Sequence, residues 1–340
     1  MVAKSPVVRA SIPGCIIRPV VGWHVGGLEP GAFMFLYQNI SLFRFFTNHL
    51  IAASFAVALF VVATARANEP APFHIQAHRG AGDALPENTL ESFEWSWAHG
   101  ITPESDLRLT KDGVIVCFHD ASFKRVPYSI DDQLKKSSVE KSTLAEVQQL
   151  DVGSFRGPQF AGERIPTLES VLAKMEGKPD RLLYLDIKSI DLKQLEALVR
   201  KHKVERQVIF TSENHRLLRD WKKLVPESQT LLWNRGTEKE LEKKLNELRR
   251  TKYAGITHLQ IHVKVGDLTS DDPFTPSSAF LKNLGRELEF NDIVFQTFSA
   301  ECKDQQAFEK LLALGVQSFA TDYPEVTLKA VQHFREKSPR

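Results

Sequence analysis

The sequence predicts an α/β protein whose main domain is a closed (β/α)8 barrel, the TIM barrel. From residue 74 onward, short apolar runs alternate with amphipathic helical stretches, and this alternation is typical of parallel βα units. About eight such units are present, the number that closes a barrel, and a barrel of about 250 residues would use most of the chain. The sequence contains no GxGxxG and no P-loop, which argues against the open nucleotide-binding folds.

Each expected strand is an apolar run, and each expected helix is an amphipathic run that separates two strands. The expected strands are His74–His78, Glu104–Leu109, Val114–His119, Leu182–Lys188, Gln207–Thr211, Thr230–Trp233, Gly255–Val263, Ile293–Phe298 and Ser318–Thr321. The expected helices are Asn88–Ala98, Leu192–His202, Arg216–Val225, Glu238–Arg250, Ser277–Glu287, Gln305–Leu314 and Glu325–Phe334.

Residues 121–164 interrupt this alternation. The segment is polar, and its one expected element is a short helix near Leu144–Leu150. Connections of this length are uncommon in compact domains unless they have a function. We therefore expect an insertion into the barrel, with an ordinary long loop as the alternative.

Residues 1–67 are expected to be an N-terminal extension that ends in a signal peptide. Leu50–Ala63 is an uncharged apolar run of 14 residues, preceded by Arg44 and followed by Thr64-Ala-Arg-Ala67. A basic flank, an apolar core and a small-residue cleavage site are the layout of a secretory signal. We expect cleavage near Ala67 and export to the periplasm or the extracellular space. A membrane anchor formed by residues 50–65 is the alternative, and it would be the only membrane contact.

Composition excludes several classes of protein. Hydrophobic residues make up 42% of the chain and charged residues 25%, as in ordinary globular proteins. The net charge is +2, but from residue 68 onward 39 basic and 41 acidic residues leave −2. No nucleic acid partner is expected from this charge. Three cysteines give no disulfide framework, and Cys117 lies in an apolar strand, where we expect it to pack.

Two histidines are the candidate acid and base. His78 ends the first expected strand, and His119 ends the strand that follows an Asp-Gly turn. The carboxyl ends of barrel strands face the active site, and histidine both donates and accepts protons near neutral pH. One such histidine alone is more often structural, but the pair favours catalysis.

Two carboxylates are the candidate metal ligands. Glu104 and Asp106 are two residues apart on one strand, so their side chains share a face. A solvated strand face is the alternative, but these residues are expected to line a barrel, where unpaired acids are costly. Oxygen-only ligands suit Mg²⁺ or Ca²⁺ rather than zinc.

Two basic side chains are candidates for binding phosphate. Arg79 follows His78 at the end of its strand, and a guanidinium binds phosphate bidentately. Lys188 shares a strand face with Asp186. A surface salt bridge is the alternative for each. Asp120 is expected to be structural or to orient His119, and Asp322 to lie near the barrel mouth.

The ordered motifs resemble those of the glycerophosphodiester phosphodiesterase family. They are His78-Arg-Gly80, Pro86-Glu-Asn-Thr89, Glu104-x-Asp106, Thr110-Lys-Asp-Gly113, His119-Asp120, Leu150-Asp-Val-Gly-Ser154, Ile165-Pro-Thr-Leu-Glu169, Leu185-Asp-Ile-Lys188 and Thr321-Asp-Tyr-Pro324. The resemblance extends over residues 74 to 335. It implies a TIM-barrel domain of this type at 68–340, with the 121–164 insertion placed over the barrel mouth.

The resemblance also implies roles for three further residues. Asp186 stands where the family usually has the glutamate that is the third metal ligand, so its reach is one methylene shorter. Glu87 is expected at the metal or directly behind its ligands. Phe298 lies where the family commonly has a tryptophan lining the pocket. From sequence alone, Asn88 is a helix N-cap before Leu90.

The resemblance implies hydrolysis of glycerophosphodiesters, such as glycerophosphocholine, to an alcohol and glycerol 3-phosphate. We therefore expect a phosphoric diester hydrolase that uses one divalent cation, Mg²⁺ or Ca²⁺, and a small-molecule substrate. A phospholipase D-like enzyme acting on intact lipids is one alternative and would need an apolar membrane-facing loop. A non-catalytic ligand-binding barrel is another. Attack by water and attack by the neighbouring glycerol hydroxyl both stay open.

Overall fold

The computed structural model describes residues 73–128 and 130–337. The barrel lies within the compact unit Pro72–Arg340. The expected signal peptide and the alternative anchor at residues 50–65 lie outside the described residues. Within the described part of the chain, no helix is long and apolar enough to span a membrane. The expected boundary between residues 67 and 68 stays a prediction.

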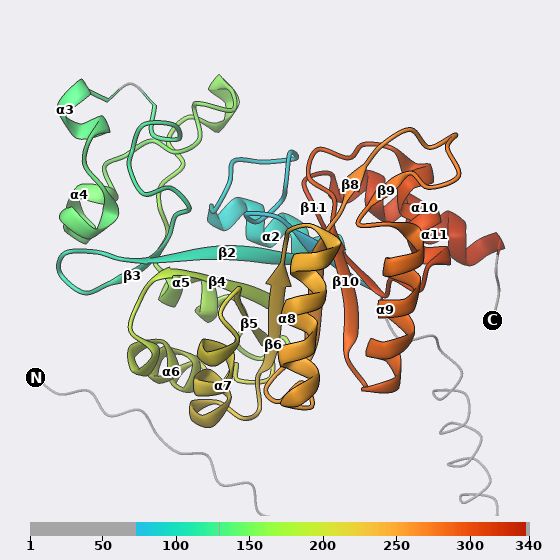
Figure 1. Cartoon of the computed structure of the whole chain (residues 1–340). Helices are drawn as coiled ribbons and strands as arrows, with labels where there is room; N and C mark the ends of the chain where they lie inside the picture. Colours follow the sequence, from blue (N-terminus) through green and yellow to red (C-terminus); the bar gives the residue numbers. More distant parts are fainter. Residues whose placement is uncertain (1–72, 129, 338–340) are drawn as a thin grey trace, which may run out of the picture. The chain divides into compact units, whose positions relative to one another are not determined.

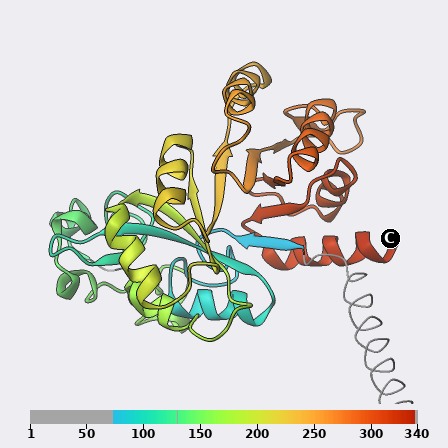
Figure 2. The same ribbon diagram turned by 90° about the horizontal axis from the view of Figure 1, so that it is seen from below.

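Eight parallel strands form a closed barrel (Figures 1 and 2). In spatial order they are β1 (His74–Ala77), β2 (Thr102–Leu109), β4 (Leu183–Ser189), β5 (Val208–Ser212), β6 (Gln229–Asn234), β7 (His258–His262), β10 (Val294–Phe298) and β11 (Ser318–Thr321). Closure occurs where β11 pairs with β1, with Ile75 opposite Phe319. The predicted TIM barrel is confirmed.

Helices on the outside of the barrel separate successive strands (Figure 1). They are α2 (Leu90–Ala98), α5 (Leu168–Ala173), α6 (Leu192–Lys201), α7 (His215–Leu224), α8 (Glu238–Arg250), α9 (Ser278–Phe290), α10 (Gln305–Ala313) and α11 (Pro324–Lys337). In α8, Leu241, Leu245 and Leu248 recur at helical spacing and are buried, as an amphipathic helix against a sheet requires. The Thr237 side chain caps its first turn.

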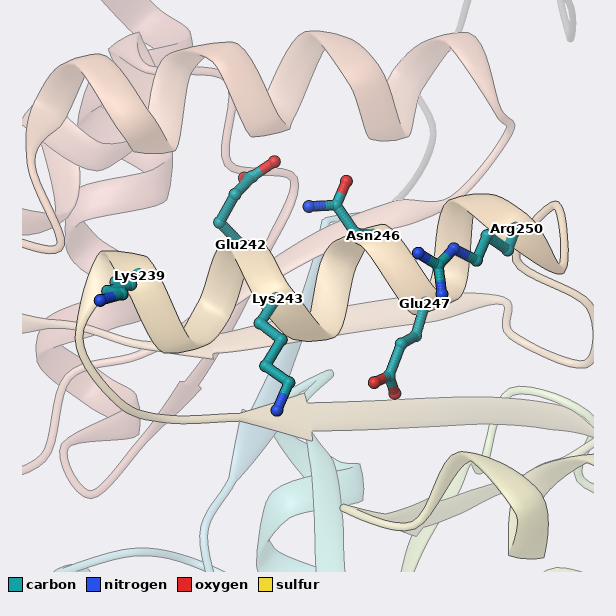
Figure 3. Close-up of a pocket in the computed structure, with 6 residues that line it drawn as sticks. All are labelled: Lys239, Glu242, Lys243, Asn246, Glu247 and Arg250. Atoms are coloured by element: carbon teal, nitrogen blue, oxygen red, sulfur yellow. The ribbon is translucent and has the colours of Figure 1, made fainter.

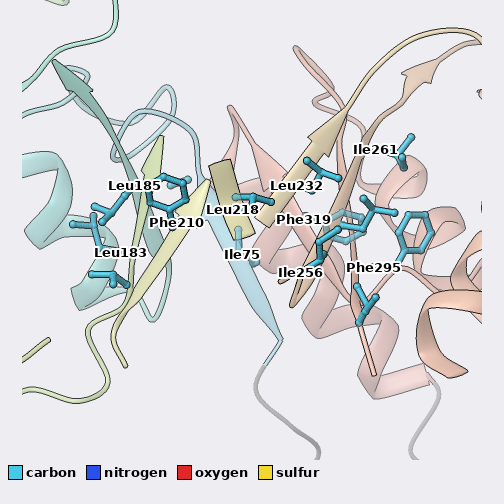
Figure 4. Close-up of a cluster of buried hydrophobic side chains, with 14 of the residues drawn as sticks. Ile75, Leu183, Leu185, Phe210, Leu218, Leu232, Ile256, Ile261, Phe295 and Phe319 are labelled. Atoms are coloured by element: carbon cyan, nitrogen blue, oxygen red, sulfur yellow. The ribbon is translucent and has the colours of Figure 1, made fainter. Parts of the chain in front are cut away.

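The main apolar core lies between the strands and the helices (Figure 4). Phe210 of β5 stacks on Trp221 of α7 with ring centroids 4.8 Å apart. Alternate side chains of the strands point the other way, into the barrel. There Gln296 donates to the Tyr184 hydroxyl at 3.2 Å and to Ser318 Oγ at 2.8 Å. The barrel interior is therefore partly polar and hydrogen-bonded.

The strand β3 (Ile115–Cys117) corrects one sequence expectation. It pairs antiparallel with β2, with Cys117 opposite Leu107, and so it is not one of the eight barrel strands. The outer half of β2 and β3 form a hairpin around the Lys-Asp-Gly turn. The argument that His119 lies at the carboxyl end of a parallel strand was therefore wrong, because the hairpin leads the chain back toward the mouth.

The 121–164 segment has its own small core. It contains α3 (Asp132–Lys135), α4 (Leu144–Val147) and two 3-10 turns, Val139–Lys141 and Pro158–Phe160. Phe118 and Phe123 pack together with buried valines and Ile165 of the same cluster. Figure 1 shows α3 and α4 above the β2–β3 hairpin, at the upper left of the view. A further short antiparallel pair, β8 (Lys264–Val265) and β9 (Phe274–Thr275), follows β7.

Candidate active site

The first strand places His78 and Arg79 at the barrel mouth. The backbone N–H of His78 donates to Thr321 of β11, and Arg79 has a positive φ of 54°, which turns the chain at the strand end. Gly80 follows, and a Cβ at that position would overlap the Ser92 hydroxyl of α2. The sharp turn therefore requires glycine and brings α2 close behind the site.

His78 is held by a carboxylate from the far end of the domain. Its Nδ1 lies 2.6 Å from Oδ1 of Asp322, which follows β11. Burial works against a charged imidazole, but the hydrogen bond to Asp322 and the nearby Glu104 outweigh it and raise the pKa of His78 above its usual value. His78 therefore holds a proton more firmly than a free histidine does.

Three buried carboxylates from two neighbouring strands form the candidate metal site. Glu104 and Asp106 come from β2 and Asp186 from β4, where Asp106 and Asp186 are register partners. One oxygen of each lies within 4.8 Å of the others. Strand alternation places all three toward the barrel interior. The shorter Asp186 thus reaches the same cluster as its partners.

The charges of this cluster do not balance. Burial, together with the charge of Glu104, raises the pKa of Asp186 to about 7, and burial also raises the pKa of Glu104. Lys188 is the neighbouring cation, with Nζ 2.6 Å from Asp186 and 3.0 Å from Asp106. Oε2 of Glu104 is buried without a hydrogen-bond partner. Three carboxylates and one ammonium leave a surplus of negative charge, and every carboxylate ligand atom is an oxygen. A hard divalent cation fits such a site.

His119 reaches the mouth through the β2–β3 hairpin. Its Nδ1 lies 2.8 Å from Oδ1 of Asp120, and its Nε2 lies 3.1 Å from Nη2 of Arg79. Both His78 and His119 are close enough to Asp106 to lower the pKa of that carboxyl, although burial opposes this effect. Both histidines are therefore near enough to Asp106 for their charges to act on it.

Residues 86–89 contribute two side chains, one of them in an unexpected role. Thr89, not Asn88, caps α2, so the N-cap expectation for Asn88 was wrong. Asn88 has a positive φ of 54° and is buried. Its amide donates to Oδ2 of Asp106 at 2.8 Å and accepts from the Asp106 N–H at 3.0 Å. The amide N–H thus serves the Asp106 carboxylate and the amide oxygen serves the Asp106 backbone N–H, a pairing that needs a side chain with both a donor and an acceptor.

Glu87 lies between two arginines. Its carboxylate is 3.3 Å from Nη1 of Arg79 and accepts two hydrogen bonds of 2.7 Å from Arg125. The cluster of Glu104, Asp106 and Asp186 does not include it.

An aromatic wall extends from His78 along three strand ends. Phe298 of β10 lies 5.1 Å from the rings of both His78 and His262, and His262 of β7 stacks at 5.4 Å on Trp233 of β6. Burial and the neighbouring charge of Arg235 lower the pKa of His262 to about 4. Sequence reasoning missed His262 and Trp233, although both follow the signal used for His78, a polar or aromatic residue at a strand end.

A surface depression of about 440 Å³ is lined by none of the candidate active-site residues. Figure 3 shows its six lining side chains on one helix, α8: Lys239, Glu242, Lys243, Asn246, Glu247 and Arg250. They are the polar face of an amphipathic helix, and none of the residues described above is among them.

Residues 78–326 match the model of the "Glycerophosphoryl diester phosphodiesterase family". The chain belongs to this family. The match begins at His78 and extends past Asp322, so it includes every residue of the site described above.

Individual family members agree with this assignment. A glycerophosphodiester phosphodiesterase from Caldanaerobacter subterraneus is 39% identical over 160 residues, which cover 44% of this chain and 62% of that protein. The putative glycerophosphodiester phosphodiesterase YhdW of Bacillus subtilis is 28% identical over 76% of this chain and 98% of its own length. The solved structure of an Oleispira antarctica phosphodiesterase is 25% identical, with a TM-score of 0.56, over 76% of this chain and 96% of that one.

Proposed function

We propose that this family member hydrolyses glycerophosphodiesters to an alcohol and glycerol 3-phosphate with one bound divalent cation, Mg²⁺ or Ca²⁺. The observation that supports this best is the buried cluster of Glu104, Asp106 and Asp186, with the charges of His78 and His119 both acting on Asp106. The similar Oleispira phosphodiesterase was solved with the product sn-glycerol-3-phosphate, and this supports the proposed product. Glu104, Asp106 and Asp186 would hold the cation, which supplies positive charge for the phosphate oxygens.

Arg79 and Lys188 are the proposed phosphate contacts. Lys188 contacts Asp186 and Asp106 of the carboxylate cluster, and although burial opposes its charge, these two carboxylates raise its pKa. Arg79 presents its guanidinium at the mouth, 3.1 Å from His119. A phosphate held here would lie within reach of the catalytic histidines.

The two histidines have different proposed roles. His78 has a raised pKa and a carboxylate on Nδ1, so it is the proposed acid that protonates the leaving alcohol. The Nε2 electron pair of His119 accepts a hydrogen bond from Arg79, and once the guanidinium of Arg79 binds the phosphate, that pair would suit a base that takes a proton from the attacking oxygen. Water and the neighbouring glycerol hydroxyl are both compatible attacking groups.

Intact lipids are less well supported as substrates. The lipid alternative needs apolar side chains on the outside of the 121–164 insertion. Of its four aromatics, Phe123 is buried and Phe155 and Phe160 are partly buried, while Tyr128 is 57% exposed. One exposed tyrosine is a small surface for inserting into a membrane.

The test is glycerol 3-phosphate release from glycerophosphocholine by the purified protein. We expect activity that excess chelator removes and that Mg²⁺ or Ca²⁺ restores. His119→Ala should lower the rate of glycerol 3-phosphate release about 100- to 10,000-fold, the usual contribution of a general base. The surface variant His333→Ala should keep the wild-type rate. Full activity in chelator, or in His119→Ala, would contradict the proposal.

We also propose that the protein is exported through the apolar segment at 50–63 and the small residues before Asn68. Sequencing the amino terminus of the mature protein tests this proposal. A terminus near Asn68 would support cleavage, and a retained segment at residues 50–65 would favour an anchor.

A further inference from the structure

Five side chains, His119 among them, form a closed ring of polar contacts. His119 Nδ1 contacts Asp120 at 2.8 Å, and Asp120 accepts from Arg125 at 2.8 and 2.9 Å. Arg125 donates to both oxygens of Glu87 at 2.7 Å, and Glu87 is 3.3 Å from Nη1 of Arg79. The ring closes where Nη2 of Arg79 lies 3.1 Å from His119 Nε2.

The contacts in this ring determine which nitrogen of His119 is protonated. A guanidinium has five donors and no acceptor, so at Arg79 the His119 Nε2 must be the acceptor. The ring proton then lies on Nδ1, where it donates to the Asp120 carboxylate. This tautomer directs the electron pair of Nε2 toward Arg79, the side on which a phosphate would bind.

Arg125 is the one member of the ring that comes from the 121–164 insertion. Its planar fork donates four hydrogen bonds to two carboxylates that are themselves mostly covered, with side-chain exposures of 13% for Glu87 and 19% for Asp120. Without it, two mostly covered acids would face each other without a shared counter-charge. Bidentate pairs of this kind fix orientation more firmly than single ion pairs do.

We propose that Arg125 is a positioning residue: through Asp120 it fixes the Nδ1-protonated tautomer of His119, and through Glu87 it fixes the guanidinium of Arg79. Arg125 itself need not touch the substrate. The insertion therefore supplies the cation that joins the His119–Asp120 pair to the Arg79–Glu87 pair. The inference rests on the proposed function, because it assigns Arg125 a part in positioning the proposed base and phosphate ligand.

The test compares Arg125→Met with Arg164→Met, a variant of another exposed arginine of the insertion that donates to the backbone oxygen of Gln149. Imidazole ¹⁵N NMR of the full-length protein reports the His119 tautomer without any substrate. Arg125→Met should show a mixture of tautomers and lose about 10- to 100-fold in kcat, as expected when a residue behind a catalytic ligand is removed. Arg164→Met should behave as wild type.

A double variant separates positioning from general stability. If Arg125 acts through Asp120, Arg125→Met should lower kcat much less in an Asp120→Asn variant than in the wild type, because the contact between Arg125 and the Asp120 carboxylate is already lost. Arg125→Lys keeps the charge without the planar fork, so it should show the same defect in a folded protein. It is the variant to use if Arg125→Met does not fold.

Two results would overturn the inference. One is an Arg125 variant that keeps the Nδ1-protonated His119 and wild-type kcat. The other is a loss of activity that adds fully to that of Asp120→Asn. If the wild type itself releases no glycerol 3-phosphate, the proposed function fails, and the tautomer measurement still decides whether Arg125 positions His119.

Discussion

Removal of Lys188 tests the charge balance of the carboxylate cluster most directly. Lys188→Met keeps most of the side-chain volume but leaves Glu104, Asp106 and Asp186 without the ammonium that lies 2.6 and 3.0 Å from two of them. At an effective dielectric constant near 20, opposite unit charges about 3 Å apart attract by about 5 kcal/mol. Desolvation cancels part of this gain, and breaking a buried pair typically costs about 3 to 5 kcal/mol.

We expect the variant to lose about 3 kcal/mol of unfolding free energy when no divalent cation is present. The loss stays at the lower end because the pKa of Asp186 is already about 7, so protonation of Asp186 relieves part of the repulsion. With saturating Mg²⁺ or Ca²⁺ the loss should shrink, since a bound cation would neutralise the same carboxylates.

The assay is urea unfolding of wild type and Lys188→Met, in excess chelator and in excess cation. Lys174→Met is the matched control, because Lys174 pairs with Glu94 in a half-exposed ion pair, and such pairs contribute about 1 kcal/mol or less. If Lys188→Met in chelator is as stable as Lys174→Met, the reasoning about an unbalanced buried cluster is refuted. A loss that added cation does not reduce would refute the metal assignment.

Two further predictions concern pH. Asp322→Asn removes the carboxylate that raises the pKa of His78. If protonated His78 is the acid, activity falls as the pH rises through that pKa, so the basic limb of kcat/KM should move to lower pH in the variant. An unchanged pH–rate profile would show that His78 is not the acid. His258 is buried with its pKa lowered, mainly by burial, from 6.5 to about 4. Between pH 6.5 and 4 the unfolded chain binds a proton at His258 that the folded protein does not. The free energy of unfolding is therefore highest above pH 6.5 and falls as the pH is lowered toward 4. Because one pKa unit corresponds to about 1.36 kcal/mol, the total loss is about 3 kcal/mol. His258→Gln should flatten this dependence in urea unfolding measured from pH 7 to 4, and equal slopes in both proteins would contradict it.

Sequence patterns predicted the barrel because strands and helices each have their own local period of hydrophobic residues. The positions of His78, directly after β1, and of Asp186, within β4, follow from apolar runs, and a parallel barrel brings neighbouring strands together without any further information. The pairing of Glu104 with Asp106 on one face likewise needs only the strand period of two.

The remaining parts of the site depend on contacts between distant segments. His78 and Asp322 are 244 positions apart, and Arg125 and Glu87 are 38 apart, so no local spacing predicts either pair. Asn88 resembles a helix cap in sequence, yet Thr89 takes that role and leaves Asn88 for Asp106. Antiparallel β3 was not distinguished from a barrel strand because both are short apolar runs.

The closing seam between β1 and β11 makes the site depend on both ends of the domain. His78 follows the first strand and Asp322 follows the last, and α11 packs against β1. During synthesis, His78 is made long before its carboxylate partner, so a ribosome-bound chain that stops short of residue 318 has neither the seam nor the partner. Catalytic competence is therefore acquired only when synthesis of the domain is nearly complete, and C-terminal truncation should abolish the assembled site rather than weaken it by degrees.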